Sequence, residues 1–487
     1  MSGSAARTAH PTTAAQSGFV RRSATYGTFP LIALASSQFI QAGEMQSIGF
    51  AVEGIQAEFG VSDFAVATIP FAMSLVGILG VVPFGILTDR TRRTLLLAAG
   101  TLTWTLAMGL TGLAGSFAML LIARMAVGAL ESTSPAAVSL ICDYWPVQKR
   151  AAKMGLYQFG AFCGAITAFG LGSVAVSLGG WRWAFFMWVP FGLVATGLLL
   201  KAPEPRRGEQ DLAASDAAGA SPMGACSDVE PEGAARVAAL FTLPTPTRIG
   251  SGDYREMGYR QAFGEVLRIR SMWFGLVTIT VGQLLLSGLG FWGIPYFKRV
   301  HELGDVAAGG LVGMLALGSA AGIVGGGYLS DRLVRKGSVN GRVHIIAAAS
   351  VGASLLLVPA FASTSLWITS PLFVLGGLLL TLPIAPAEAL MADVVVCDLR
   401  GRAATLRSIV RTLSSAGPLL IGALSDVVGL RWALVLFMPL YAVGGLVALG
   451  ARRTYAADLA FVLAETERTE VYRRARELVT EAPLNQS

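Results

Sequence analysis

Twelve long apolar segments, separated by short polar stretches, dominate this sequence of 487 residues. In an α-helix, a segment of about 20 residues spans the roughly 30 Å hydrocarbon core of a bilayer. Backbone polar groups must be hydrogen-bonded inside a membrane, so only helices and closed barrels cross it, and a barrel would show short segments of alternating polarity. The composition agrees, because 54% of the residues are hydrophobic and only 14% are charged. The chain is therefore predicted to be an all-α integral membrane protein.

The apolar segments fall into two sets of six. The first set covers residues 30–52, 64–88, 94–114, 117–142, 152–178 and 182–200. The second set covers residues 273–297, 306–330, 343–362, 366–392, 404–428 and 431–450. We therefore predict one six-helix bundle within residues 30–200 and another within residues 271–450.

Three polar regions surround the bundles. Residues 1–29 lack the apolar core and cleavage site of a secretory signal and are predicted to be a cytoplasmic tail. Residues 201–270 are rich in Pro, Ala, Gly and acidic residues, a composition that cannot bury a core, and are predicted to be a linker. The linker ends in a segment with apolar residues at helical spacing, which predicts a helix on the membrane surface over 259–270. Residues 451–487 mix Glu and Arg and are predicted to be a solvated tail.

Basic residues gather in alternate loops, which predicts the orientation in the membrane. The basic loops carry Arg90, Arg92, Arg93, Lys149, Arg150, Lys153, Arg332, Arg335, Lys336, Arg342, Arg400, Arg402, Arg407, Arg452 and Arg453. The other loops carry Arg182, Lys298, Arg299 and Arg431, beside the acidic Glu53, Glu58, Asp63 and Asp305. The positive-inside rule therefore places both termini and the linker in the cytoplasm. Topology explains the net charge of +7 better than nucleic-acid binding does.

The two halves of the chain repeat each other. The segment GILTDRTRR (85–93) recurs as GYLSDRLVRK (327–336), at an offset of 242 residues. GSVAVSLGGWRW (172–183) recurs as GALSDVVGLRW (422–432), and PAAVSLICDYWPVQKRAA (135–152) recurs as PAEALMADVVVCDLRGRAA (386–404). Such a repeat predicts two pseudo-symmetric bundles with a binding site between them at the membrane midplane.

These motifs resemble those of the major facilitator superfamily over residues 25–450. Within that superfamily, IQAEFGVSDF (55–64), RMAVGALESTSPA (124–136) and GGWRWAFF (179–186) are similar to the spinster branch and to its neighbours that carry organic acids. Spinster proteins carry an acidic residue on the first helix, usually Asp followed by Arg, and Glu44 followed by Met45 stands at that position here. The resemblance implies a twelve-helix secondary transporter that works by alternating access.

The repeated loop motif implies a gate by the same resemblance. Its residues are Gly85, Asp89, Arg90 and Arg93 in the first half, and Asp331 and Arg332 in the second. In the superfamily such residues hold the two halves together at the cytoplasmic face in one conformation and release them in the other. The alternative is a basic loop that serves topology alone, although topology would not require an acid at the same place in both loops.

Three charged residues lie within predicted spans of the first half. Arg124 and Glu131 are seven residues apart, so they share one helix face at about 10 Å spacing along the axis, and Glu44 falls between them in depth. Each ionised side chain at mid-membrane is costly, by about 3 kcal/mol even on the mild insertion scale. In the matching part of the second half, no charged residue stands at the positions of Arg124 and Glu131, so the fold does not require these charges. A fixed Arg124–Glu131 pair is the alternative to a functional site.

We expect Glu44, Arg124 and Glu131 to form a proton and substrate switch in a shared cavity. Two acids beside one cation titrate as a coupled set, in which one is ionised and the other has a raised pKa. Protonation removes a charge from the cavity, which changes the relative free energies of the outward-facing and inward-facing states.

Further polar residues in the spans are candidates for substrate or gate contacts. These are Gln41, Gln158, Gln283, Tyr296, Glu388 and Arg411. Interhelical hydrogen bonds are an equal alternative for the Gln and Tyr side chains, solvation for Glu388, and snorkelling or a head-group contact for Arg411.

The predicted function is proton-coupled transport across a bacterial inner membrane by a monomer. The resemblance implies an amphiphilic cargo such as a lysophospholipid or sphingoid lipid, and the alternatives are a small organic anion or drug-like compound and, beyond those, a sensor or channel. No His lies within a predicted span and no phosphate-binding loop occurs, so neither an enzyme nor ATP drive is indicated. The four cysteines show no metal-ligand spacing, so no metal or cofactor is predicted.

Overall fold

The structure is a computed structural model that describes residues 26–130, 134–145, 147–206, 244, 259–396, 399, 403 and 413–465. The regular elements in these ranges are all helices. The first half contains α1 (Phe29–Phe59), α2 (Asp63–Arg90), α3 (Arg93–Gly112), α4 (Phe117–Leu130), α5 (Ser134–Tyr144), α6 (Val147–Thr167), η2 (Ala168–Gly172), α7 (Ser173–Gly179), α8 (Trp183–Phe186) and α9 (Trp188–Lys201). The second half contains α12 (Tyr259–Leu267), α13 (Arg270–His301), α14 (Asp305–Arg335), α15 (Gly341–Ala362), α16 (Leu366–Thr381), α17 (Ile384–Asp393), α19 (Ala416–Val428), α20 (Leu430–Phe437), α21 (Pro439–Ala448) and η4 (Leu449–Arg453).

Nine stretches of helix in the described ranges are long and apolar enough to cross a membrane. They coincide with nine of the twelve predicted spans. The predicted spans at 117–142 and 404–428 contain the shorter apolar helices Phe117–Gly128 and Ala416–Val428. The remaining span, at 30–52, is covered by α1, which has 31 residues and carries Gln38, Gln41, Glu44 and Gln46 along its length. The prediction of an all-α membrane fold with two six-helix bundles is confirmed.

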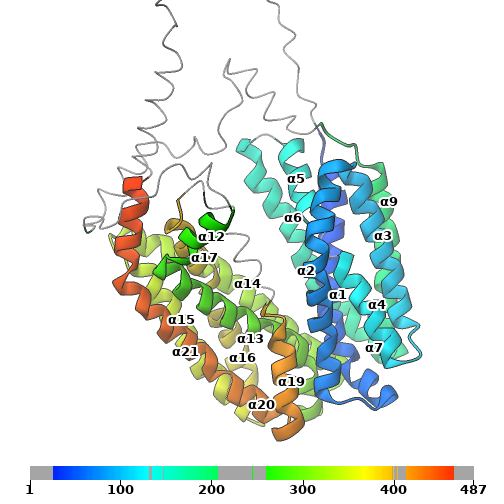
Figure 1. Ribbon diagram of the computed structural model, residues 1–487. Coiled ribbons are helices and arrows are strands. Elements are labelled where there is room, and N and C mark those ends of the chain that lie inside the picture. The colour runs from blue at the N-terminus through cyan, green and yellow to red at the C-terminus, as the bar shows by residue number, and fades with distance from the viewer. Residues whose placement is uncertain are drawn as a thin grey trace, which may run out of the picture.

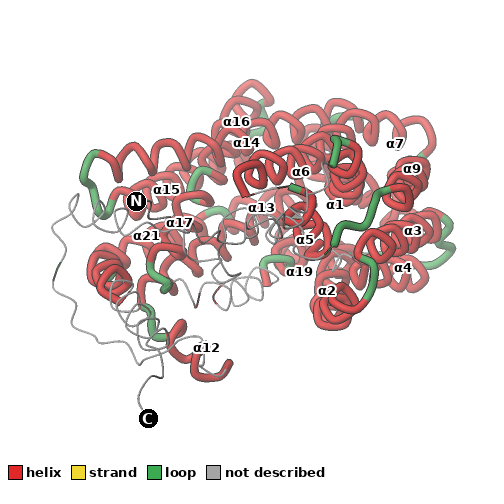
Figure 2. Tube along the Cα trace, turned by 90° about the horizontal axis from the view of Figure 1, so that it is seen from above, coloured by secondary structure: helices red, strands yellow, loops and turns green. Residues whose placement is uncertain are grey.

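The two halves lie side by side and meet at one end. Figure 1 shows them converging where α7, α19 and α20 lie and separating toward the end where α5, α6 and α12 lie. Seen from above, the helices of the two halves occupy opposite sides of the molecule (Figure 2). The helices that touch across the divide are α2 with α19, α1 with α13, and α14 with η2 and α7.

Contacts between the halves involve residues near one end of these helices. A Cβ added to Gly49 of α1 would lie 3.2 Å from the Phe291 carbonyl of α13, and one added to Gly422 of α19 would lie 2.9 Å from the Asp63 carbonyl of α2. A continuous apolar cluster that includes Phe50 and Trp292 joins the two halves at this depth. We call this the closed end.

Glycines let the helices within each half approach closely. An added Cβ on Gly164 of α6 would lie 1.9 Å from the Phe39 carbonyl of α1, and one on Gly128 of α4 would lie 2.1 Å from the Met73 carbonyl of α2. In the second half, a Cβ added to Gly326 of α14 would lie 2.0 Å from the Leu382 carbonyl. Small residues at helix interfaces are typical of membrane bundles, where van der Waals contact must replace the hydrophobic effect.

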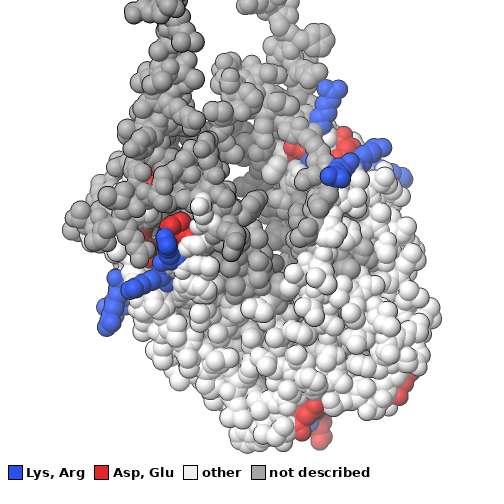
Figure 3. All heavy atoms as spheres, viewed as in Figure 1, with Lys and Arg blue, Asp and Glu red and all other residues white. Residues whose placement is uncertain are grey.

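The end opposite the closed end is basic. Figure 3 shows Lys and Arg side chains gathered there on both halves, whereas the charged side chains visible at the closed end on this face are mainly acidic. We call it the basic end. α12 forms within the segment expected to be a surface helix. Residues 455–465, which were expected to be solvated, are instead helical, and their Tyr455 and Val462 are buried in an apolar cluster of the second half.

Candidate functional site

Glu44 and Arg124 form an ion pair inside the first half, far from both ends of their helices. Glu44 lies on α1 and Arg124 on α4, and their side chains are each 1% exposed. The sequence placed these two residues at similar depth on opposed helices, and the structure brings them into direct contact. Glu131, the third member of the predicted switch, lies outside the described residues.

The surroundings of this pair are apolar. Arg124 Nη1 donates to the thioether of Met108 at 3.3 Å, and its guanidinium lies 5.4 Å from the centre of the Phe185 ring. Beyond the contact of Glu44 Oε1 with Arg124 Nη2, the other carboxylate oxygen of Glu44 and the Nε of Arg124 have no hydrogen-bond partner among the described residues. A buried ion pair with unsatisfied polar atoms is costly, and each unsatisfied atom can still make a hydrogen bond to a ligand or water.

The face of α1 beside Glu44 looks toward the second half. Met45 is 59% exposed and lies one helical turn before Gly49, which packs on α13. Gln41 and Gln283 are half-buried and make no hydrogen bond within the described part of the chain. Gln158 of α6 accepts a hydrogen bond from Gln38 of α1 at 3.0 Å, which is the interhelical alternative considered above.

The remaining predicted contact residues are Tyr296, Glu388 and Arg411. Tyr296 is fully buried and its hydroxyl donates to the Phe361 carbonyl at 3.1 Å, so it fixes α13 to α15 within the second half. Glu388 is half-buried in α17 and interacts with neighbouring groups. Arg411 falls outside the described residues.

Arg93, a member of the loop motif at the basic end, is buried. Its Nη1 pairs with the Asp143 carboxylate and donates to Ser139 Oγ at 2.8 Å, while its Nε donates to Glu204 at 3.0 Å. Glu204 also accepts from the backbone and side chain of Thr94, at 2.8 and 2.7 Å. Burial alone would raise the pKa of Glu204, but the hydrogen bonds from Thr94 and Arg93 outweigh it and lower that pKa. Asp143, Ser139 and Thr94 lie in the first half, and Glu204 lies in the chain just after α9, so none of these partners lies in the second half.

Of the other motif residues, Arg90, Asp331 and Arg332 have no partner in the opposite half among the described residues. Arg90, Asp331 and Arg332 are exposed at the basic end, and Gly85 and Asp89 lie on α2 at positions whose side chains are outside the description. The second half repeats the Arg93 arrangement, because Arg342 at the start of α15 pairs with Asp393 at the end of α17. Tyr455 donates to the same carboxylate at 2.6 Å.

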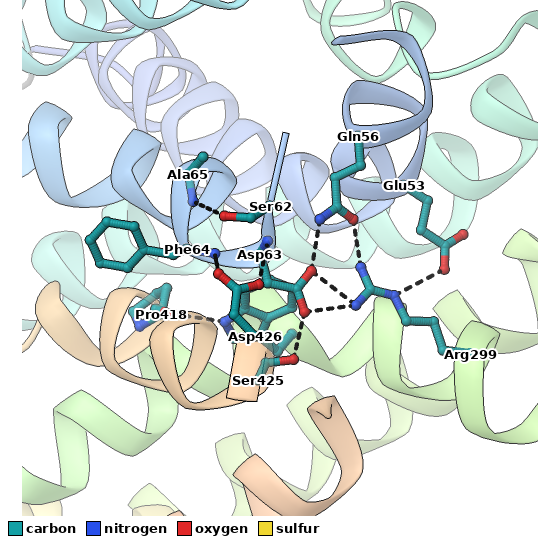
Figure 4. Close-up of polar contacts among 11 residues, drawn as sticks. Glu53, Gln56, Ser62, Asp63, Phe64, Ala65, Arg299, Pro418, Ser425 and Asp426 are labelled. Atoms are coloured by element: carbon teal, nitrogen blue, oxygen red, sulfur yellow. Dashed lines mark hydrogen bonds and ion pairs between the residues drawn. The ribbon is translucent and has the colours of Figure 1, made fainter. Parts of the chain in front are cut away.

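Charged contacts between the halves occur at the closed end. Asp63, the first residue of α2, accepts from Arg299 Nη1 of α13 at 3.0 and 2.9 Å and from Ser425 Oγ of α19 at 2.5 Å (Figure 4). Gln56 of α1 completes the ring, since it donates to Asp63 at 2.7 Å and accepts from Arg299 at 2.6 Å. We call Gln56, Asp63, Arg299, Ser425 and Asp426 the closed-end network.

Asp426 caps the start of α2 from the other half. Its two carboxylate oxygens accept from the backbone amides of Asp63 and Phe64, at 3.0 and 3.1 Å (Figure 4). The next amide, of Ala65, donates to the side chain of the N-cap residue Ser62 at 3.2 Å. The first amides of a helix have no partner within it and carry the positive end of the helix dipole, so a carboxylate is well suited to this position.

A second ion pair joins the halves beside this network. Lys298 of α13 contacts Glu53 of α1 and Asp305 of α14, each at 2.7 Å. The sequence showed these charges only as loop residues. The signal that could have identified them is opposite charge on loops of the two halves that face the same side of the membrane.

Metal binding has no support in the described residues, where no group of three or more His, Cys, Asp or Glu could hold an ion. The arrangement instead combines a buried, incompletely satisfied ion pair with a charged network that joins two half-molecules at one end. Such a molecule can change which of its ends is closed when the charge of the buried pair changes.

Comparisons with known proteins agree with this geometry. The profile of the Major Facilitator Superfamily matches residues 34–416. The Arabidopsis thaliana protein named "Probable sphingolipid transporter spinster homolog 1" is 24% identical over 353 residues, which cover 71% of this chain and 68% of that protein. The Escherichia coli protein named "Probable L-galactonate transporter" is 22% identical over 354 residues, which cover 70% of each chain. A crystal structure of a bacterial homolog of the human lysosomal transporter Spinster, inward-facing and unoccupied, superposes with a TM-score of 0.71 at 20% identity, covering 88% of this chain and 98% of that one.

Proposed function

From the premise that the chain belongs to the Major Facilitator Superfamily, and is therefore a multi-pass membrane transporter and not an enzyme, we propose that it couples protons to the movement of an amphiphilic lipid. The cargo class is a lysophospholipid or sphingoid lipid, and the movement is by alternating access. The observation that carries the proposal is the Glu44–Arg124 pair, buried in one half and left with unsatisfied polar atoms.

The asymmetry between the halves supports a role in coupling. At the offset of 242 residues, Leu286 stands in the second half where Glu44 stands in the first, and the match of Pro135 with Pro386 sets Leu375 against Arg124. The second half therefore builds the equivalent helices without either charge. A charge that the fold does not need, kept where it is costly, is best explained by function.

Protonation of Glu44 is the proposed coupling step. It removes the negative partner of Arg124, leaving the guanidinium to seek another acceptor, for which Glu131 is the nearest acid along the sequence. α1 also carries Met45 toward the space between the halves, so a change at Glu44 moves a helix that cargo contacts. Cargo and proton then act on one equilibrium between two states.

We also propose an orientation in the membrane and an oligomeric state. The basic end faces the cytoplasm of a bacterial cell, which places both termini inside and the closed end outside. The arrangement described here is then open inward, and the transporter works as a monomer in the inner membrane.

A small organic anion is the second candidate cargo. It is supported by the similarity to transporters named for L-galactonate and, over 85 residues at 34% identity, for hexuronate. A transport assay distinguishes the two cargoes, because an organic-anion carrier accumulates a sugar acid that has no lipid chain.

The test is transport by purified protein in liposomes. We expect uptake of a fluorescent lysophospholipid to depend on an imposed pH gradient, and Glu44→Gln to abolish that dependence while the protein remains folded. Glu302→Gln is the matched control, because Glu302 is exposed and distant from the buried pair. Counterflow of labelled lysophospholipid distinguishes a carrier from a channel, since only a carrier exchanges across a closed barrier.

Two results would contradict the proposal. If the pH dependence of uptake were unchanged in both Glu44→Gln and Glu131→Gln, these residues would not couple protons to transport. Uptake of galactonate with no movement of lysophospholipid would replace the cargo by the organic anion.

A further inference from the structure

The repeat relates the ends of α1 and α13 residue by residue. At the offset of 242 residues, Gly60 corresponds to Glu302, and both adopt the left-handed conformation that ends their helix, with φ of 63° and 54°. Asp63 and Asp305 then begin the following helices at the same offset. Two residues before each left-handed position, Glu58 stands in the first half and Val300 in the second.

In the first half, Glu58 forms an ion pair with an arginine. Arg182, in the GGWRW segment, donates to both oxygens of Glu58 at 2.5 and 2.6 Å. Arg182 Nη2 also donates to the Ala114 carbonyl, just after α3, at 3.0 Å, and Trp181 donates to Glu58 at 2.9 Å. The guanidinium is therefore held between a carboxylate and a backbone carbonyl.

In the second half, the corresponding arginine lacks the carboxylate. Arg431, in the matching GLRW segment, donates to the Ala362 carbonyl at the end of α15, as Arg182 does at the end of α3. Among the described residues no carboxylate pairs with Arg431, and its Nε has no hydrogen-bond partner. Val300 and Leu430 stand at the positions of Glu58 and Trp181.

A pocket of about 450 Å³ lies beside Arg431, with Val300 in its wall. Val428, Leu430 and Trp432 provide further apolar lining. Asp63 and Arg299 also reach the pocket, but they neutralise each other, so the uncompensated charge is that of Arg431. The volume is within the range of small-molecule sites, which combine apolar walls with few polar groups.

We propose that this pocket binds an organic anion whose carboxylate or phosphate pairs with Arg431 and whose short apolar part packs on Val300, Leu430 and Trp432. The ligand supplies the acid that Glu58 supplies in the first half. Charge-assisted hydrogen bonds to guanidinium are among the stronger polar contacts, and a partly buried guanidinium without an anion gains most from one. The bound anion lies next to Asp63 and competes with it for Arg299, so occupancy weakens the contact between the halves.

Binding of hexanoate and hexyl phosphate to the full-length protein in phosphatidylcholine nanodiscs tests this site by calorimetry. We expect saturable binding of both anions, weakened by salt, and no binding of hexanol. Arg431→Gln should weaken binding at least tenfold, while Arg452→Gln, which removes an exposed arginine at the basic end, should leave it unchanged.

Val300→Glu is the decisive variant, because it installs the acid of the first half and leaves Arg431 in place. It should abolish anion binding and keep or raise the melting temperature, whereas the uncharged Val300→Gln should retain binding. Anion binding of equal strength in the wild type, Arg431→Gln and Val300→Glu would overturn the proposal, as would equal binding of hexanol and hexanoate.

The source of the anion is distinguished by a second set of nanodiscs that contain phosphatidylglycerol. Loss of hexanoate binding there, restored by removing the anionic lipid, identifies a lipid head group as the occupant, and unchanged binding identifies a soluble anion. The pocket includes neither Glu44 nor Arg124, so Glu44→Gln should retain saturable hexanoate binding that is lost in Val300→Glu, and failure of either idea leaves the other standing.

Discussion

Charged residues do different work at the two ends of the molecule. At the basic end, Arg93 pairs with Asp143 and Arg342 pairs with Asp393, each within its own half. At the closed end, Asp63 and Arg299 pair across the two halves. Contacts within a half persist whichever way the transporter faces and stabilise its fold, whereas contacts between halves exist in one state and set the balance between states.

The largest expected effect comes from breaking the buried cluster at the basic end. Arg93→Met leaves the carboxylates of Asp143 and Glu204 without their cation, and removing one partner of a buried pair costs about 3–5 kcal/mol. We expect a large fall in the thermal unfolding midpoint of the purified protein. The neighbouring exposed Arg92→Met should change it little, and equal effects of the two variants would show that Arg93 does not hold the first half together.

Breaking the closed-end network should change conformation more than stability. Arg299→Gln removes two charge-assisted hydrogen bonds to Asp63, each worth about 1.5–3 kcal/mol, so the equilibrium should shift at least tenfold toward opening of this end. The measurement is the distance distribution between spin labels at the exposed positions Leu178 and Val427, one in each half, after the native cysteines are replaced.

The control for this shift lies at the other end. Arg335→Gln, which is exposed on α14 at the basic end, should leave the distance distribution as in the wild type. A distribution that stays short in Arg299→Gln would mean that apolar contacts alone keep this end closed.

The helix cap supplied across the divide should have a smaller effect. Asp426→Ala removes the acceptor of two amides at the start of α2, and loss of such a cap typically costs about 1 kcal/mol. We expect a partial shift in the same spin-label distances. Asp426→Asn keeps an acceptor and should shift them less; an equal shift in both variants would point to charge rather than capping.

The smallest effect is expected for an ion pair that lies at the closed end but does not join the two halves. Glu58 and Arg182 lie at the closed end but within one half, beyond the predicted span 30–52, and the hydrogen bond from Arg182 lowers the pKa of Glu58 from 4.5 to about 2. Because the folded-state pKa is the lower one, this pair stabilises the protein fully above pH 4.5, and the contribution is lost as the pH falls toward 2. Screening by solvent keeps it small, since Glu58 is 38% exposed.

Melting temperatures between pH 7 and pH 3 measure this contribution. Glu58→Gln should remove a small part of the acid sensitivity and leave the spin-label distances unchanged. A change in those distances would show that the pair, although contained in one half, still reports the state of the closed end.

The sequence was sufficient to predict the helices and the depths of charged residues within them, because these depend on local pattern. It said much less about contacts between the halves, because these depend on how the halves are arranged. Hydrophobic segments of the right length gave the helices, and counting the rise per residue placed Glu44 and Arg124 at compatible depths. The closed-end network was missed, because Asp63 and Asp426 are 363 residues apart and meet only when the halves close at that end. The resemblance implied contacts across the halves for Arg93, whose described partners lie in the first half and just after α9.

The cap on α2 offers a way to follow the opening of the closed end without attached labels. The amide protons of Asp63 and Phe64 are sheltered by a side chain of the other half, which departs whenever the two halves separate at the closed end. Their exchange with deuterated solvent should therefore run in step with gate opening, while the amide of Ala65, whose acceptor Ser62 travels with the same helix, provides an internal reference. Mass spectrometry of a single peptide would then time each turnover in native lipid.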